Sequence, residues 1–218
     1  MGVAVDKFSS IKALNKAVLD EIISIDNSSQ KGKTILLPGG TTPRSLFKEM
    51  SKTKHKWNNT NFYPTDERLV PLDDPNSNYG QIKENFDKSP TLKKRLHPLT
   101  NEDGSINIDK LLLHKTIDLA ILGIGLDGHF ASIFPENQIK MSKQIIAKPL
   151  EFEEVESHIA VSRRITFTFN TLKSSKKIIV IARGREKEKI FESREKHPTL
   201  PINRLLAVRP DTKFYWTE

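Results

Sequence analysis

The 218-residue chain contains no cysteine. Disulfides, a thiol nucleophile and thiolate metal sites are therefore excluded. No apolar run approaches the ~20 residues that a membrane-spanning helix needs, and the first segment, MGVAVDKFSS, lacks the apolar core of a signal peptide. We therefore expect a cytoplasmic protein without a membrane partner.

The chain also lacks the motifs of nucleic-acid binding, although it is basic. Lys and Arg outnumber Asp and Glu by 35 to 27, which gives a formal net charge of +8. Such an excess attracts either nucleic acids or small anions. The basic residues are scattered, and no zinc-finger, helix-turn-helix or aromatic-plus-basic pattern accompanies them. We expect a lysine-rich solvated surface and no nucleic-acid partner.

What the sequence does contain is an alternation of strand and helix patterns. Helices are predicted over 8–25, 44–50, 79–86, 166–175 and 186–192, and strands over 34–40, 61–67, 118–123, 158–162, 176–184 and 213–217. This order predicts an α/β fold with a mostly parallel sheet flanked by helices. Because no repeat or low-complexity segment divides the chain, we expect one domain over 1–218. The charged, poorly periodic stretch 138–157 is expected to be an insertion or a flexible loop.

The most informative segment is DLAILGIGLDGHFASIFP, at 118–135. An apolar strand pattern stops at two glycines, and Asp127 and His129 follow at once. A parallel sheet commonly places its site at such a strand end, and an imidazole exchanges protons near neutral pH. The string GIGLDG fits the dinucleotide fingerprint GxGxxG, but the embedded Asp127 argues against that function. A structural histidine is the alternative interpretation.

A second glycine turn, LPGGTTP at 37–43, follows another strand pattern. Gly39, Gly40 and Thr41 would present backbone N–H groups at a helix start, which suits a phosphate. We expect a threonine hydroxyl to cap this helix and Pro43 to lie just inside it. An ordinary strand–helix turn remains the alternative.

Charged residues at other expected element ends complete the candidate site. Asp66 and Arg68 lie at a strand end, where the carboxylate would orient or deprotonate a group and the guanidinium would bind an anion. Arg164 and Lys187 are expected at strand–helix junctions, from which they would join the glycine turn around one phosphate. Solvated surface charges are the alternative for each of these residues.

These motifs together resemble the 6-phosphogluconolactonase family. The resemblance runs in order over most of the chain and rests on LPGGTTP, TDERLVP, NSNY, GIGLDGHFASIFP, RIT, GREK and PINRLL. It implies a modified Rossmann-like fold of the deaminase/phosphogluconolactonase type. It also implies hydrolysis of 6-phosphogluconolactone to 6-phosphogluconate in the oxidative pentose phosphate pathway. No metal or organic cofactor is implied, and a monomer or weak homodimer is expected.

The resemblance also implies roles for individual residues. His129 resembles the general base that activates water, and Asp127 and Asp66 resemble carboxylates that hold the geometry. Arg68 matches the arginine of the substrate pocket. The phosphate would lie on the glycine turn and its cationic partners, which are Gly39, Gly40, Thr41, Arg164 and Lys187. The chain departs from the commonest pattern at Phe130, where threonine is usual, and at Asp74 and Glu136; Phe130 is expected to alter the pocket wall.

Two other functions compete with this one. Glucosamine-6-phosphate deaminases are similar in fold, but they carry a DEY motif and a glutamate five residues after the histidine, where this chain has Arg68 and Phe134. A non-catalytic sugar-phosphate-sensing domain is the second alternative. It would need a DNA-binding segment, which the sequence lacks, and retention of Asp127 and His129 favours an enzyme.

Overall fold

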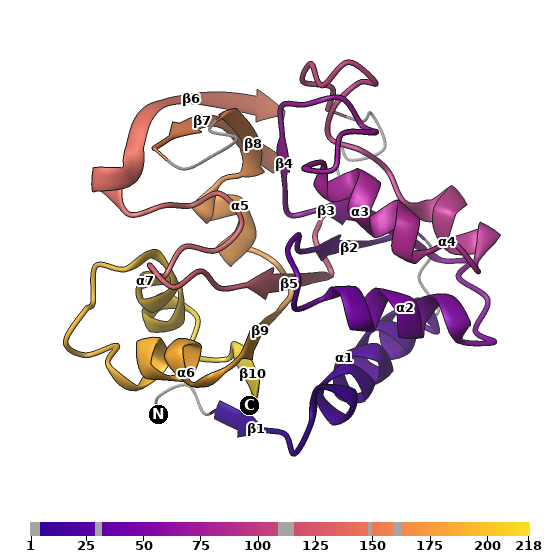
Figure 1. Cartoon of the computed structure of the whole chain (residues 1–218), viewed down its shortest axis with the longest axis horizontal. Coiled ribbons are helices and arrows are strands. Elements are labelled where there is room, and N and C mark those ends of the chain that lie inside the picture. The colour runs from indigo at the N-terminus through magenta and orange to yellow at the C-terminus, as the bar shows by residue number, and fades with distance from the viewer. Residues whose placement is uncertain (1–4, 29–31, 109–115, 148–149, 159–162) are drawn as a thin grey trace.

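The computed structural model of the chain describes residues 5–28, 32–108, 116–147, 150–158 and 163–218 (Figure 1). Its central sheet has six parallel strands in the order β1-β10-β9-β5-β2-β3. They are β1 (Val5–Lys7), β2 (Lys33–Leu37), β3 (Thr60–Pro64), β5 (Leu119–Gly123), β9 (Lys177–Arg183) and β10 (Lys213–Thr217). The predicted α/β fold with a mostly parallel, helix-flanked sheet is confirmed.

Helices cover both faces of this sheet because its strands are apolar on both sides. In β2, for example, Ile35 packs in one core cluster and Leu36 in the other. One face is covered by α1 (Ile11–Asp26), α2 (Arg44–Lys52), α3 (Asn78–Asn85) and α4 (Pro90–Arg95), and the other by α5 (Phe169–Lys173), α6 (Arg185–Glu192) and α7 (Pro201–Val208) (Figure 1). No helix in the described ranges is long and apolar enough to cross a membrane.

A second, antiparallel sheet was not predicted. It has the order β4-β8-β7-β6, formed by β4 (Asp66–Arg68), β6 (Ile139–Ala147), β7 (Leu150–Ser157) and β8 (Arg163–Phe167). The expectation of an insertion or flexible loop over 138–157 is therefore wrong. In β7, buried Leu150, Phe152 and Val155 are interleaved with glutamates that lie nearer the surface, so charged residues obscure the apolar face in the sequence.

Several predicted boundaries also need correction. The predicted strand 61–67 is divided between β3 and β4, which belong to different sheets. The predicted helix 166–175 is shorter in the structure. Thr166 still belongs to β8, and α5 begins after Thr168, whose side chain caps it by accepting a hydrogen bond from the Thr171 N–H. Arg164 consequently lies inside a strand and not at a strand–helix junction. Of the predicted strand 158–162, all but His158 lies outside the described residues.

The start of α2 differs from the prediction as well. Pro43 occupies the N-cap, and no side chain caps the helix. The hydroxyls of Thr41 and Thr42 therefore do not serve as caps. Both residues line a pocket at the carboxyl end of β2.

Candidate active site

A pocket of about 220 Å³ opens where the carboxyl ends of β2 and β5 meet β4 and β8. Every predicted site residue except Asp127 lines it. The lining comprises Pro38, Gly39, Gly40, Thr41, Thr42, Pro43, Thr65, Asp66, Arg68, Asn78, Gly123, Ile124, Gly125, His129, Ala131, Arg164 and Lys187. The fold thus brings together residues that are up to about 150 positions apart, as expected for the carboxyl edge of a parallel sheet.

A tight turn after β5 joins Asp127 to His129. The Gly128 N–H donates to the Gly125 carbonyl at 3.1 Å, and Gly128 has a φ of 79°. The Asp127 Oδ1 atom lies 2.5 Å from the His129 Nδ1 atom and accepts from the His129 N–H at 3.2 Å. Because Nδ1 is engaged, Nε2 is the ring nitrogen available to a ligand or water.

The charge of Asp127 is set by this contact. Burial alone would raise the pKa of the Asp127 carboxyl, but the hydrogen bond and the positive charge of His129 outweigh burial and lower this pKa to about 2. Asp127 is therefore an anion at neutral pH, and it orients the imidazole with Nδ1 as donor.

Close packing fixes the other sides of the His129 ring. A Cβ atom on Gly125 would lie 2.2 Å from the imidazole, so only glycine fits there. The Phe134 ring packs against the imidazole with 4.9 Å between centroids, and the Arg164 guanidinium lies 5.4 Å from the Phe134 ring centroid. Phe134 thus joins the histidine to the buried arginine.

Asp66 is held differently, by neighbouring side chains. It is 4% exposed. Its Oδ2 atom accepts from the Ser132 hydroxyl at 2.6 Å, its Oδ1 atom accepts from the Thr65 hydroxyl at 3.0 Å, and the Arg164 Nη1 atom lies 3.8 Å from Oδ2. A carboxylate with both oxygens engaged is suited to holding the site together rather than to transferring protons.

Arg68 and Asn78 also line the pocket. The Arg68 Nη1 atom donates to the Asn78 Oδ1 atom at 2.7 Å and to the Asn76 carbonyl at 2.8 Å. A Cβ on Gly39 would lie 2.0 Å from that same Asn78 oxygen, so glycine is required for this close approach. Sequence reasoning missed Asn78, because the SNY triplet also fits an ordinary turn; its place one residue after a serine N-cap is the signal that was available.

Cationic side chains and the glycine turn line the same pocket. Gly40 has a φ of 92°, and no N–H of residues 39–42 donates a hydrogen bond to another described residue. Lys187 lies in α6, and burial lowers the pKa of its ammonium. Arg164 pairs in register with Arg68 across β8 and β4; burial is the main cause that lowers the pKa of Arg164, and the charge of Arg68 adds to it. Two opposed cations favour an anion between or beside them.

Phe130 does not form the pocket wall that the sequence led us to expect. Its side chain is fully buried in the core, with its ring 6.1 Å from that of Phe169. The residue after His129 therefore faces away from the pocket. Among the described residues, no group of His, Asp and Glu side chains is arranged to hold a metal ion.

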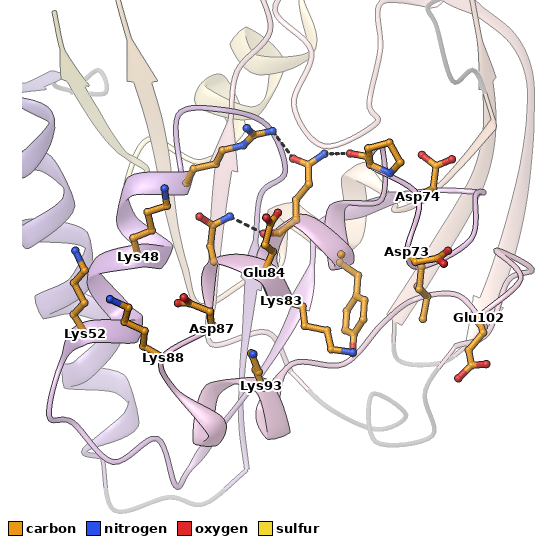
Figure 2. Close-up of a pocket in the computed structure, with 17 residues that line it drawn as sticks. Lys48, Lys52, Asp73, Asp74, Lys83, Glu84, Asp87, Lys88, Lys93 and Glu102 are labelled. Carbon is orange, nitrogen blue, oxygen red and sulfur yellow. Dashed lines mark hydrogen bonds between the residues drawn. The ribbon is translucent and has the colours of Figure 1, made fainter.

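A larger hollow of about 1420 Å³ lies beside α2 and α3 (Figure 2). Charged side chains of both signs line it: Lys48, Lys52 and Lys88 lie at one end with Asp87 beside them, and Asp73, Asp74 and Glu102 lie at the other. It contains none of the predicted site residues and no histidine. The smaller pocket is the candidate active site because it holds His129 together with Arg164 and Lys187, whose pKa values are lowered by burial.

Comparisons with known proteins give a consistent result. The family model of glucosamine-6-phosphate isomerases/6-phosphogluconolactonase matches residues 6–216. The chain is 32% identical over 189 residues to a 6-phosphogluconolactonase of Thermotoga maritima, covering 82% of this chain and 75% of the relative. It is 28% identical over 221 residues to that of Helicobacter pylori, covering 94% of each.

Solved structures agree in fold. A 6-phosphogluconolactonase from Thermotoga maritima superposes with a TM-score of 0.78 at 25% identity, covering 99% of this chain and all of the other. One from Shewanella baltica gives a TM-score of 0.80 at 21% identity, covering 99% of this chain and 98% of the other. These superpositions cover 99% of this chain, so they include the antiparallel sheet that the sequence did not predict.

Proposed function

Because the chain belongs to the glucosamine-6-phosphate isomerase/6-phosphogluconolactonase family, we propose that it hydrolyses 6-phosphogluconolactone to 6-phosphogluconate in the oxidative pentose phosphate pathway. The relatives that match most of its length carry the lactonase name. The observation that carries the proposal is the Asp127–His129 pair at the edge of a pocket that also holds a glycine turn and buried cations.

In the proposed reaction, His129 is the general base. Its Nε2 atom takes a proton from water, and the water oxygen attacks the lactone carbonyl. Asp127 holds the ring by its Nδ1 side and stabilises the imidazolium that forms. Arg68 stabilises the tetrahedral oxyanion. When the intermediate collapses, the bond between the carbonyl carbon and the ring oxygen breaks, and that oxygen takes the proton held by the His129 imidazolium, which restores the neutral base.

The phosphate supplies binding energy at a distance from the carbonyl. The free N–H groups of Gly39, Gly40 and Thr41 at the start of α2 suit its oxygens. Lys187 and Arg164 supply the positive charge, and both line the same pocket. This division leaves the carbonyl end of the substrate beside His129.

The alternative activity, deamination of an aminosugar phosphate, has less support from the pocket. It would use an acid–base partner beside the histidine, and the apolar ring of Phe134 packs there instead. Asp66 is the carboxylate among the pocket-lining residues, and its oxygens are already engaged. A sugar-phosphate sensor would not require the ordered Asp127–His129 contact, which favours catalysis.

We further propose a single domain over 1–218 that acts in the cytoplasm as a monomer or weak homodimer, with a phosphosugar lactone and no nucleic acid as partner. The family resemblance also predicts activity without a metal. Elution from heparin at low salt would support the absence of nucleic-acid binding.

The test of the proposed activity is direct. 6-Phosphogluconolactone is generated in place by a dehydrogenase, and its disappearance is compared with the spontaneous rate, with and without a chelator. Acceleration that survives chelation is expected. No acceleration, together with binding of 6-phosphogluconate, would point to the sensing alternative.

A further inference from the structure

The proposed mechanism does not use Glu67, a fully buried carboxylate beside the site. Glu67 lies in β4 between Asp66 and Arg68 and is 0% exposed. Strand geometry turns its side chain to the face opposite to those two residues. Burial raises the pKa of the Glu67 carboxyl, which reflects the cost of holding this charge away from water. Such a costly group needs compensating contacts.

Three of the four contacts lie at the start of α3, and the fourth is made within β4. The Glu67 Oε1 atom accepts from the N–H groups of Arg68 and Asn78, each at 2.7 Å. The Oε2 atom accepts from the Tyr79 N–H at 2.6 Å and from the Ser77 hydroxyl at 3.1 Å. A carboxylate is favoured at a helix N-terminus, and these charge-assisted bonds tie the first turn of α3 to β4.

The turn that Glu67 holds carries Asn78, whose side chain contacts three parts of the site. Its Oδ1 atom accepts from Arg68 and lies against Gly39 of the glycine turn. Its Nδ2 atom donates to the Asp66 carbonyl at 2.8 Å. Asn78 therefore orients one side chain and spaces two backbone segments, and its own main chain is set by Glu67.

We propose that Glu67 is a positioning residue, which fixes the first turn of α3 and through Asn78 aims the Arg68 guanidinium into the active-site pocket. The inference rests on the proposed function, in which Arg68 stabilises the tetrahedral oxyanion of the substrate. Glu67 itself does not line the pocket, so it acts only through its neighbours.

The first test is the nearly isosteric change Glu67→Gln. In the wild type, both carboxylate oxygens accept hydrogen bonds from backbone N–H groups. An amide has only one acceptor oxygen, so its NH₂ group would lie against at least one backbone N–H donor and could not accept from it. We expect the turn to shift and kcat/KM to fall by roughly 10- to 100-fold, as for a small misplacement of a catalytic group. Glu84→Gln is the matched control, since Glu84 is exposed on the same helix.

Asn78→Ala tests the same path without disturbing the buried carboxylate. It removes one of the two acceptors of the Arg68 guanidinium, leaving the Asn76 carbonyl, and is expected to lower kcat/KM to a similar extent. If Glu67→Gln does not fold, this variant alone decides the outcome. Unchanged kinetics in a folded Asn78→Ala protein would overturn the proposal.

A double-mutant cycle separates positioning from general destabilisation. In an Arg68→Ala background there is no guanidinium to aim, so Glu67→Gln should cause no further loss of kcat/KM, although it still lowers the unfolding midpoint. A full additional loss in that background would show that Glu67 acts by another route.

A measurement independent of activity keeps this proposal distinct from the proposed function. The Arg68 Nε atom is buried without a hydrogen-bond partner in the described structure, so its side-chain N–H resonance should be resolved by NMR and lost in Arg68→Ala. In Glu67→Gln and Asn78→Ala it should move toward the resonances of exposed arginines. An unmoved resonance overturns the positioning role. A moved resonance in a protein without lactonase activity supports the positioning and rejects the proposed function.

Discussion

The two halves of the pocket are built in different ways. The half that carries His129 is a local turn, in which glycines allow the backbone to bring Asp127 and the imidazole together. The other half joins β4 to α3 through buried hydrogen bonds of Asp66 and Asn78, and to β8 through strand pairing and the Asp66–Arg164 ion pair. Substitution in the first half should therefore affect chemistry while the fold persists. Substitution in the second should affect stability first.

The largest expected effect on activity lies in the local half. His129→Ala removes the proposed general base and should lower kcat by about 10²- to 10⁴-fold. Because the side chain is 27% exposed, the urea midpoint should change little. His197→Ala, at an exposed position, is the control. Unaltered kcat/KM in His129→Ala would reject its assignment as the base.

The largest expected effect on stability lies in the network. Asp66→Ala removes the acceptor of the Ser132 and Thr65 hydroxyls and deprives buried Arg164 of this carboxylate. Breaking a buried charge pair costs about 3–5 kcal/mol. Asp127→Ala, in the partly exposed pair, should cost less than this. Equal losses in urea unfolding would remove the distinction between the two halves.

This difference also explains what the sequence could predict. The glycines, Asp127 and His129 are consecutive, so their pattern alone indicated a site after a strand. The contacts of Glu67 and Asn78 depend on how α3 docks on β4, and the sequence shows only a polar cluster there. Likewise β7 alternates buried apolar residues with glutamates, which reads as a charged loop until its pairing with β8 is known. Phe130 was expected to alter the pocket wall because it departs from the threonine usual at that position of the family pattern, but its side chain lies in the core.

The phosphate end should respond through binding. Lys187→Ala removes a partly buried ammonium that lines the pocket, and we expect KM to rise about tenfold while kcat stays nearly constant, as for an interaction made equally in the ground and transition states. Lys189→Ala, exposed on the same helix, should leave both constants unchanged. A fall in kcat without a rise in KM would place Lys187 at the carbonyl instead.

The smallest expected effect is on how the free energy of unfolding depends on pH. It also contrasts the two halves most directly. The folded-state pKa of Asp127 is about 2, below its ordinary 3.8, so the unfolded chain binds more protons between these values. Its contribution to stability is therefore present above about pH 4 and is lost as the pH falls toward 2.

Glu67 has the opposite sign, because burial raises its pKa above the ordinary 4.5. The folded protein binds the extra proton, so the contribution of Glu67 declines as the pH rises above 4.5. Urea midpoints measured from pH 2 to 8 should then show two trends. The stability difference between the wild type and Asp127→Asn should shrink as the pH falls below 4. The advantage of the wild type over Glu67→Gln should shrink as the pH rises above 4.5. Parallel curves for Asp127→Asn and the wild type between pH 4 and 2 would mean that His129 does not stabilise the Asp127 anion in the folded protein.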